Sequence, residues 1–144
     1  MSISVRVLDW VYGRPAADMR VRLSRDHGGE WHEEASGRTD VDGYLTGWPP
    51  GNMTRGIHRL DVDLDEYFAG IGVMPFYPRI TIIFRVTDLT ASYHIPVLIT
   101  PHAYATYSET SPSGGPPAEA KAAEVKATEV KEDARDEVSP ARPD

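Results

Sequence analysis

The 144-residue chain contains no cysteine. This absence excludes disulfide bonds, a thiolate nucleophile and any zinc site with sulfur ligands. The chain also lacks an apolar run that approaches the roughly 18 residues of a membrane span. Its first residues, MSISVRVLDW, lack the apolar core and cleavage site of a secretory signal. We therefore expect a cytoplasmic protein that has no membrane partner.

Positive charge is scarce as well. Fifteen Lys and Arg residues oppose 22 Asp and Glu residues, which gives a net charge of −7 and a pI of about 5.2. A nucleic-acid-binding protein needs a basic face to neutralise phosphates. The composition therefore predicts a small-molecule or protein partner and no nucleic acid.

Residues 111–144 have no aromatic residue, Leu, Ile or Met, but contain five prolines. A segment of this composition cannot bury an apolar core. We therefore expect one folded domain over residues 1–110, followed by a disordered acidic tail rich in Pro and Ala. The alternative for the tail is a docking segment for a partner.

Apolar residues alternate with other residues along three segments, 2–8, 19–24 and 79–86. This period of two is typical of β-strands with one buried face. In the first segment, the alternation directs Arg6 and Leu8 away from the core. The residues expected to face the core are Ile3, Val5, Val7, Met19, Val21, Leu23, Ile80, Ile82, Phe84 and Val86.

Turn signals separate the strand-like segments at 25–30 (RDHGGE), 40–44 (DVDGY) and 48–52 (WPPGN). The DVDG motif also occurs in calcium loops, but the closing Glu of such a loop would fall at Pro49, so a hairpin turn is preferred. His58 has no acidic or histidine partner nearby in the sequence. We therefore expect no metal site.

Only residues 63–72, DLDEYFAGIG, have a helical pattern. Asp63 could cap this helix, and Gly70 or Gly72 could end it. Short alternating strands with a single brief helix favour an all-β fold, a sandwich of seven or eight strands.

Pro96 interrupts an otherwise strand-like segment, SYHIPVLIT, at residues 92–100. Proline has no N–H to donate to a strand ladder, so this strand should lie at a sheet edge, contain a bulge or turn outward at that point. The face that carries His94, Pro96 and Leu98 should therefore be irregular. We expect a functional site there.

Five segments together resemble the transthyretin-like family that includes hydroxyisourate hydrolase: VRVLDWVYGRPAADMRVRL, GRTDVDGYL, GIHRLDVDLDEYF, PFYPRITIIFRV and YHIPVLITPHAYATY. The resemblance covers about residues 3–108. It implies a two-sheet antiparallel β-sandwich with a short helix near 64–70. It also implies a homotetramer, a dimer of dimers whose cleft is lined by the first and last strands. In the hydrolase, water opens the hydroxyisourate ring in this cleft without a metal or cofactor.

The family resemblance also implies a catalytic signature. It consists of a His before VLD, an Arg after TDxDG, a His within YHVP and a terminal Tyr-Arg-Gly-Ser. His94 and Tyr107 match it. The positions that depart from it are Arg6, Tyr44, Ser108, Glu109 and Thr110. The chain thus lies between the hydrolase pattern and that of hormone-carrying transthyretins.

Three residues are candidates for catalysis. A neutral imidazole at His94 can accept a proton from water near neutral pH, although a strand histidine can also be purely structural. Arg6 faces the same outer side, where a guanidinium could hold a carboxylate or a developing oxyanion; the alternative is a solvent-facing arginine. Tyr107 would narrow the cleft into a shallow pocket for a small planar ring.

Further residues are candidate substrate contacts. Tyr44 could donate a hydrogen bond to an oxyanion or could simply be a hairpin aromatic. Ser108 could position the substrate. The apolar residues of the same face, Leu8, Pro96 and Leu98, would complete the pocket.

These patterns predict a divergent hydroxyisourate-hydrolase-like enzyme of purine metabolism. It would act on a small heterocyclic or carbonyl compound by cofactor-free acid–base chemistry, either hydrolysis or a repurposed cyclisation or isomerisation in a biosynthetic pathway. The alternative is a non-catalytic ligand-binding or assembly module, since a fold does not determine its chemistry. We also expect the tail to shield the cleft in part.

Overall fold

The computed structural model describes residues 2–48 and 53–112. Most of the predicted tail and of the predicted 48–52 turn lie outside these ranges. The elements, in chain order, are β1 (Ser2–Asp9), β2 (Arg14–Pro15), β3 (Arg20–His27), β4 (Glu30–Arg38), β5 (Tyr44–Trp48), β6 (Gly56–Asp63), α1 (Asp65–Ala69), β7 (Arg79–Val86), β8 (Ser92–Ile99), β9 (Tyr104–Thr106) and β10 (Glu109–Ser111).

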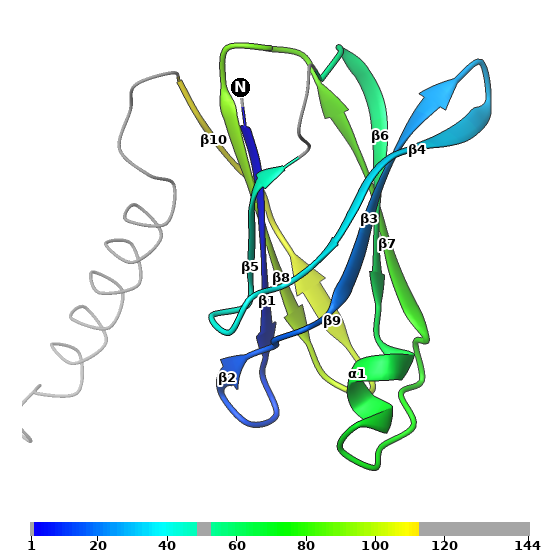
Figure 1. Ribbon diagram of the computed structural model, residues 1–144, viewed down its shortest axis with the longest axis vertical. Helices are drawn as coiled ribbons and strands as arrows, with labels where there is room; N and C mark the ends of the chain where they lie inside the picture. Colours follow the sequence, from blue (N-terminus) through cyan, green and yellow to red (C-terminus); the bar gives the residue numbers. More distant parts are fainter. Residues whose placement is uncertain (1, 49–52, 113–144) are drawn as a thin grey trace, which may run out of the picture. The chain divides into compact units, whose positions relative to one another are not determined.

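The strands form two sheets that face each other (Figure 1). The first sheet is built around the neighbouring strands β1 and β8; β2 and β5 pair with β1, whereas β9 and β10 pair with β8. The second sheet has the order β4-β3-β6-β7. The predicted all-β sandwich with one short helix is confirmed.

One strand pair departs from the predicted antiparallel arrangement. β1 and β8 run parallel, and their register is continuous from Ser2 opposite Ser92 to Asp9 opposite Ile99. The other strand pairs of the described chain are antiparallel. A parallel pair needs a long crossover connection, and here the intervening chain passes through the second sheet.

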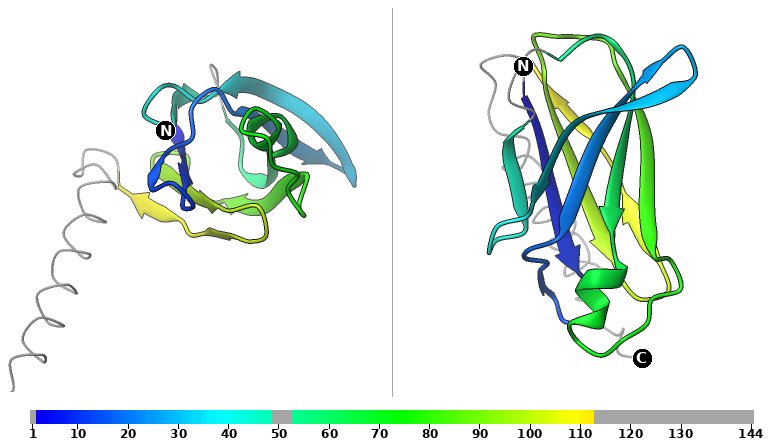
Figure 2. Two further views of the ribbon diagram at one scale, coloured as in Figure 1. Left: turned by 90° about the horizontal axis from the view of Figure 1, so that it is seen from below. Right: turned by 45° about the vertical axis from the view of Figure 1, so that its right-hand side comes forward.

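The core lies between the two sheets and follows the predicted alternation. Ile3, Val5 and Val7 are fully buried, whereas Arg6 is half-buried on the outer face of the first sheet. The inward residues of β3 and β7 join the same core, as does Phe68 of α1. The helix lies at one end of the sandwich (Figure 2). Full burial of such a side chain contributes roughly 1.5–3 kcal/mol.

The helix α1 differs from the prediction at its start but agrees with it at its end. Its N-cap is Leu64, which makes no side-chain capping hydrogen bond, so the prediction that Asp63 caps the helix is wrong. Asp63 instead belongs to β6, where it is the register partner of Arg79. Gly70 is the C-cap, as predicted.

The two predicted hairpin turns have different outcomes: the turn at 25–30 closes the antiparallel β3–β4 hairpin, whereas the turn at 40–44 links β4 of the second sheet to β5 of the first, so a hairpin is wrong there. Gly28 and Gly29 connect β3 to β4, both with positive φ. Before β5, the Oδ1 atom of Asp40 accepts hydrogen bonds from the backbone N–H groups of Asp42 and Tyr44, both at 2.9 Å. This Asx-type turn fixes the backbone on which Tyr44 enters the first sheet.

Pro96 lies in the centre of the first sheet, so an edge position is wrong for this strand. The irregularity occurs in the neighbouring strands: β10 pairs with β8 only up to His94, and β9 only from Val97 onward. The carbonyl oxygen of Pro96 points to this side, because the Thr106 hydroxyl donates to it at 2.8 Å. A backbone N–H at residue 96 would point to the same side as this carbonyl. Because proline has no N–H, β8 cannot donate a ladder hydrogen bond between the segments paired with β10 and β9.

Candidate functional site

The outer face of the first sheet brings the predicted site residues into two neighbouring rows. In one row, Glu109 on β10, His94 on β8 and Ser4 on β1 are register partners. The next row contains Pro96 on β8, Arg6 on β1 and Tyr44 on β5. Directly opposed side chains on neighbouring strands are about 5 Å apart at Cβ, so each row forms a continuous strip.

The imidazole of His94 is held by a side chain that was not among the predicted site residues. Ser4 Oγ lies 2.6 Å from His94 Nδ1, and only 7% of His94 is exposed. Two tautomers satisfy this hydrogen bond: either the Ser4 hydroxyl donates to Nδ1, or Nδ1–H donates to Ser4 Oγ. In the second case, Nε2 is the basic nitrogen.

The side chains of Arg6 and Tyr44 stack on the same face. The guanidinium carbon of Arg6 lies 4.6 Å from the Tyr44 ring centroid, and Arg6 Nε donates to the carbonyl oxygen of Asp42 at 3.4 Å. The ring of Tyr44 is also 6.4 Å from that of His94, with an interplanar angle of 30°. The cation–π contact holds the guanidinium on the Tyr44 ring, and that ring is in turn a neighbour of the His94 imidazole. The structure therefore brings Arg6, Tyr44 and His94 together.

The predicted apolar contacts lie further along the same strands. Leu8 and Leu98 are register partners on β1 and β8. Leu98 and Pro96 are buried, while Leu8 is half-buried. Tyr107 and Ser108 lie between β9 and β10, beside the interruption at Pro96, and both are exposed. Tyr107 and Ser108 therefore border the two rows on the side of the last strands.

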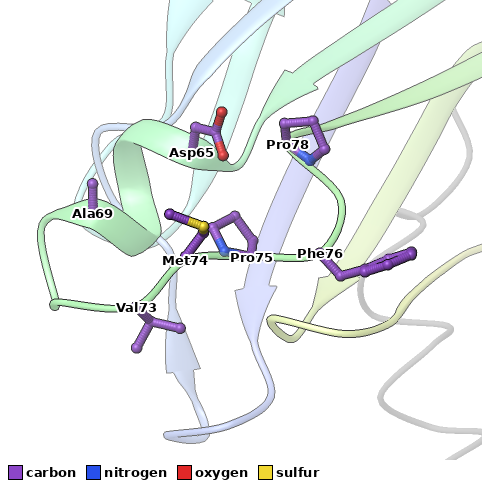
Figure 3. A pocket seen from close by; sticks show the side chains of 7 residues that line it. All are labelled: Asp65, Ala69, Val73, Met74, Pro75, Phe76 and Pro78. Carbon is purple, nitrogen blue, oxygen red and sulfur yellow. The ribbon is translucent and has the colours of Figure 1, made fainter.

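A hollow of about 480 Å³ lies between α1 and the loop before β7 (Figure 3). Its lining comprises Asp65, Ala69, Val73, Met74, Pro75, Phe76 and Pro78. The lining contains a single titratable side chain, Asp65, and no imidazole. This hollow therefore lacks the pair of groups that acid–base chemistry requires.

An aromatic cluster continues from that loop along the surface. The rings of Phe76 and Tyr77 meet edge to face at 4.9 Å between centroids, and those of Tyr77 and Tyr104 at 5.4 Å. Phe76 is 72% exposed and Met74 is 89% exposed. Exposed apolar groups of this size commonly mark an interaction surface.

His58 is a second buried imidazole, located on β6 in the interior. Its Nε2 lies 3.5 Å from Glu34 Oε2, an acidic partner that was not apparent from the local sequence. The geometry does not form a hydrogen bond, and Nε2 has no such partner within the described chain. Burial lowers the pKa of His58 below its usual value of 6.5, although the Glu34 charge opposes this effect.

Asp9 joins the end of β1 to α1. Its Oδ2 accepts a hydrogen bond from the Tyr67 hydroxyl at 2.6 Å, and its Oδ1 accepts from the backbone N–H groups of Val11 and Tyr12. Burial, together with this hydrogen bond to Asp9, raises the pKa of Tyr67. The cluster has a structural role, because it lies at the opposite end of β1 from Ser4.

Residues 2–48 and 53–112 contain no group of three or more His, Asp or Glu side chains placed to hold a metal ion. No helix there is long and apolar enough to cross a membrane.

The sandwich, with its short helix and its parallel β1–β8 pair, defines a transthyretin-like fold. Transthyretin from Sparus aurata superimposes with a TM-score of 0.73 at 26% identity, covering 76% of this chain and 97% of that chain. Sea bream transthyretin in complex with thyroxine gives a TM-score of 0.72, also at 26% identity, covering 76% and 95% of the two chains.

Residues 3–108 match the HIUase/Transthyretin family, and the chain belongs to this family. It is 32% identical over 108 residues to 5-hydroxyisourate hydrolase from Mus musculus, covering 73% of this chain and 92% of that protein. It is likewise 32% identical over 109 residues to 5-hydroxyisourate hydrolase from Caulobacter vibrioides, covering 73% and 95%. The predicted resemblance is thus confirmed at the level of the family.

Proposed function

We propose that this protein is a divergent hydroxyisourate-hydrolase-like enzyme that acts on a small heterocyclic or carbonyl compound without a cofactor. The observation that carries the proposal is the outer-face site: an imidazole held by Ser4, near the Tyr44 ring on which the Arg6 guanidinium stacks. The two relatives named 5-hydroxyisourate hydrolase support the reaction class. The corresponding context is purine metabolism.

In the proposed reaction, His94 is the general base. With Nδ1–H donating to Ser4 Oγ, the Nε2 lone pair accepts a proton from water while the water oxygen adds to a carbonyl carbon. The Arg6 guanidinium balances the negative charge that develops on the carbonyl oxygen. The imidazolium then protonates the ring nitrogen as its bond to carbon breaks, so one water molecule is consumed and the base is regenerated.

The substrate pocket in this proposal extends from His94 along β8. Pro96 and Leu98 form its apolar floor together with Leu8 from β1, while Tyr107 forms its wall and Ser108 supplies a polar contact. A planar ring packed on such a surface would place its polar edge toward the imidazole. If hydrolysis is not the reaction, the same acid–base pair suits a cyclisation or isomerisation.

A second candidate function is ligand binding without turnover. It is favoured by the contact between Arg6 and Tyr44, which commits part of the guanidinium to a stacked arrangement. It is also supported by the thyroxine complex of the similar sea bream protein. In this alternative, the same face binds an anionic planar ligand but lacks a second acid–base group to complete a reaction.

We also propose that the protein assembles as a homotetramer. The exposed apolar surface around Phe76 and Met74 supports an assembly, because water contact with such groups is unfavourable. Sedimentation equilibrium of the full chain tests it. A monomeric mass across the accessible concentration range would contradict the proposal.

Ring opening of freshly generated hydroxyisourate, followed by absorbance, tests the enzyme directly. We expect faster decay with the wild-type protein, and loss of the acceleration in His94→Ala. His102→Ala is the matched control, because His102 is an exposed histidine in the loop between β8 and β9. Equal decay rates with and without wild-type protein would exclude the hydrolase, and binding measurements would then test the second candidate.

A further inference from the structure

Glu109 places a carboxylate in the same strip as His94. The two residues are register partners on β10 and β8, so their side chains lie on one face of the sheet. The Oε2 atom of Glu109 is buried and has no hydrogen-bond partner within the described chain. A buried polar atom without a partner is unfavourable, and such atoms are rare in folded proteins. This carboxylate therefore needs a donor that the described residues do not supply.

The position of Glu109 relative to Arg6 indicates where that donor would come from. Neighbouring strands are about 5 Å apart, and β8 separates β10 from β1, so Glu109 and Arg6 belong to strands about 10 Å apart. His94 lies between them. A single planar ring over His94 would therefore have one edge facing a carboxylate and the other facing a guanidinium.

We infer that Glu109 is a specificity-determining residue that selects ligands bearing N–H donors on the edge facing β10. Amidines and ring N–H groups meet this requirement, because each presents a donor to an acceptor-only carboxylate. A carboxylate-bearing edge is disfavoured there, since like charges would meet in a partly buried site. The opposite edge, toward Arg6, takes a carbonyl or anionic oxygen. The inference uses the proposed function only to place the ligand over His94.

Three probes with the same phenyl ring separate these requirements: benzamidine is a cationic donor, benzamide is neutral, and benzoate is an anionic acceptor. Their dissociation constants for the full chain would be measured by ligand-observed NMR or calorimetry. We expect benzamidine to bind at least about tenfold more tightly than benzamide, in line with a charge-assisted hydrogen bond. Benzoate should turn its carboxylate toward Arg6, because the edge at Glu109 disfavours an anion.

Substitutions assign the preference to Glu109. Glu109→Gln keeps the size of the side chain but removes its charge, and should abolish the benzamidine preference and raise the affinity for benzoate. Glu33→Gln is the matched control, because Glu33 is an exposed carboxylate on β4 of the other sheet. It should leave the affinities for the three probes unchanged. Equal thermal unfolding temperatures would show that both variants are folded.

Several results would overturn the inference. They are a wild-type protein that binds benzamidine no more tightly than benzamide, a benzamidine preference that persists in Glu109→Gln, or no measurable binding of any probe. Should Glu109→Gln fail to fold, Glu109→Asp replaces it, because the shorter side chain withdraws the carboxylate and should reduce the preference at least threefold. Failure of the inference leaves the hydroxyisourate assay unaffected, since that assay measures turnover by His94 and not the selection of a donor-bearing edge.

Discussion

Ser4 and His94 are directly opposed on the parallel strands β1 and β8, and their side chains share a hydrogen bond of 2.6 Å between Oγ and Nδ1. The bond fixes the orientation of the imidazole. A ring held in this way is preorganised, since no rotation is needed before proton transfer. The position of the imidazole thus depends on the pairing of two strands that are far apart in the sequence.

Removing the Ser4 hydroxyl should therefore impair function more than stability. Ser4→Ala should lower the rate of the His94-dependent reaction about tenfold, whereas the free energy of unfolding should fall by only about 1 kcal/mol. Ser4→Thr keeps a hydroxyl on a strand-compatible side chain and is the matched control. Steady-state kinetics and urea unfolding measure the two quantities. An unchanged rate in Ser4→Ala would show that the hydrogen bond has no part in catalysis.

Arg6 should resist replacement by lysine. Lysine retains the positive charge but lacks the planar guanidinium that stacks on Tyr44. We expect both Arg6→Lys and Arg6→Ala to weaken binding of an anionic planar ligand, with a loss of about 10- to 100-fold for alanine and a smaller loss for lysine. Calorimetry with benzoate gives both values. Wild-type affinity in Arg6→Ala would remove Arg6 from the site.

His58 should make the stability of the protein depend on pH. Because burial lowers its pKa in the folded state, the unfolded chain binds more protons just below pH 6.5. The free energy of unfolding should therefore rise with pH up to about 6.5 and level off above it.

Urea unfolding at a series of pH values measures this dependence. His58→Leu should flatten the curve below pH 6.5, whatever its effect on the absolute stability. His102→Leu is the control, because the exposed His102 side chain should leave the slope unchanged. The interpretation fails if the slope is the same in wild type and His58→Leu.

Much of the fold follows from local patterns that are legible in the sequence. The alternation in β1 distinguished the buried Val5 and Val7 from the outward Arg6, because a strand has a fixed period of two. The same alternation directs Ser4 outward, so its place on the outer face could be predicted from the sequence. Its hydrogen bond to His94 could not be predicted, since it depends on the register between β1 and β8.

The remaining differences also arise from long-range contacts. Glu34 meets His58 only because β4 and β6 lie in one sheet with β3 between them. Pro96 correctly indicated an irregular ladder, but the interruption falls on the neighbouring strands and not at a sheet edge. Local sequence shows that a residue has an unusual backbone requirement, whereas the packing of distant strands determines how that requirement is met.

Gly43 provides a test of how closely the site depends on the turn that precedes it. Its φ is +79°, and a Cβ at this position would lie 2.5 Å from the carbonyl oxygen of Val7. Gly28 also has positive φ, +63°, but a Cβ there would meet no atom within 4 Å. Gly28→Ala should therefore cost about 1 kcal/mol for backbone strain alone, and Gly43→Ala should cost at least about 2 kcal/mol more, because the clash is with backbone.

The Gly43 substitution should also disturb the site. The carbonyl oxygen of Gly43 accepts a hydrogen bond from the Val7 N–H at 2.9 Å, which ties the turn to β1 immediately before Tyr44. Relief of the clash would move Tyr44 away from Arg6, so benzoate affinity should fall in Gly43→Ala and stay at the wild-type value in Gly28→Ala. Chemical unfolding and calorimetry on the same two variants measure both effects. Equal destabilisation by the two substitutions would show that the turn yields without strain, and the position of Tyr44 would then not depend on Gly43.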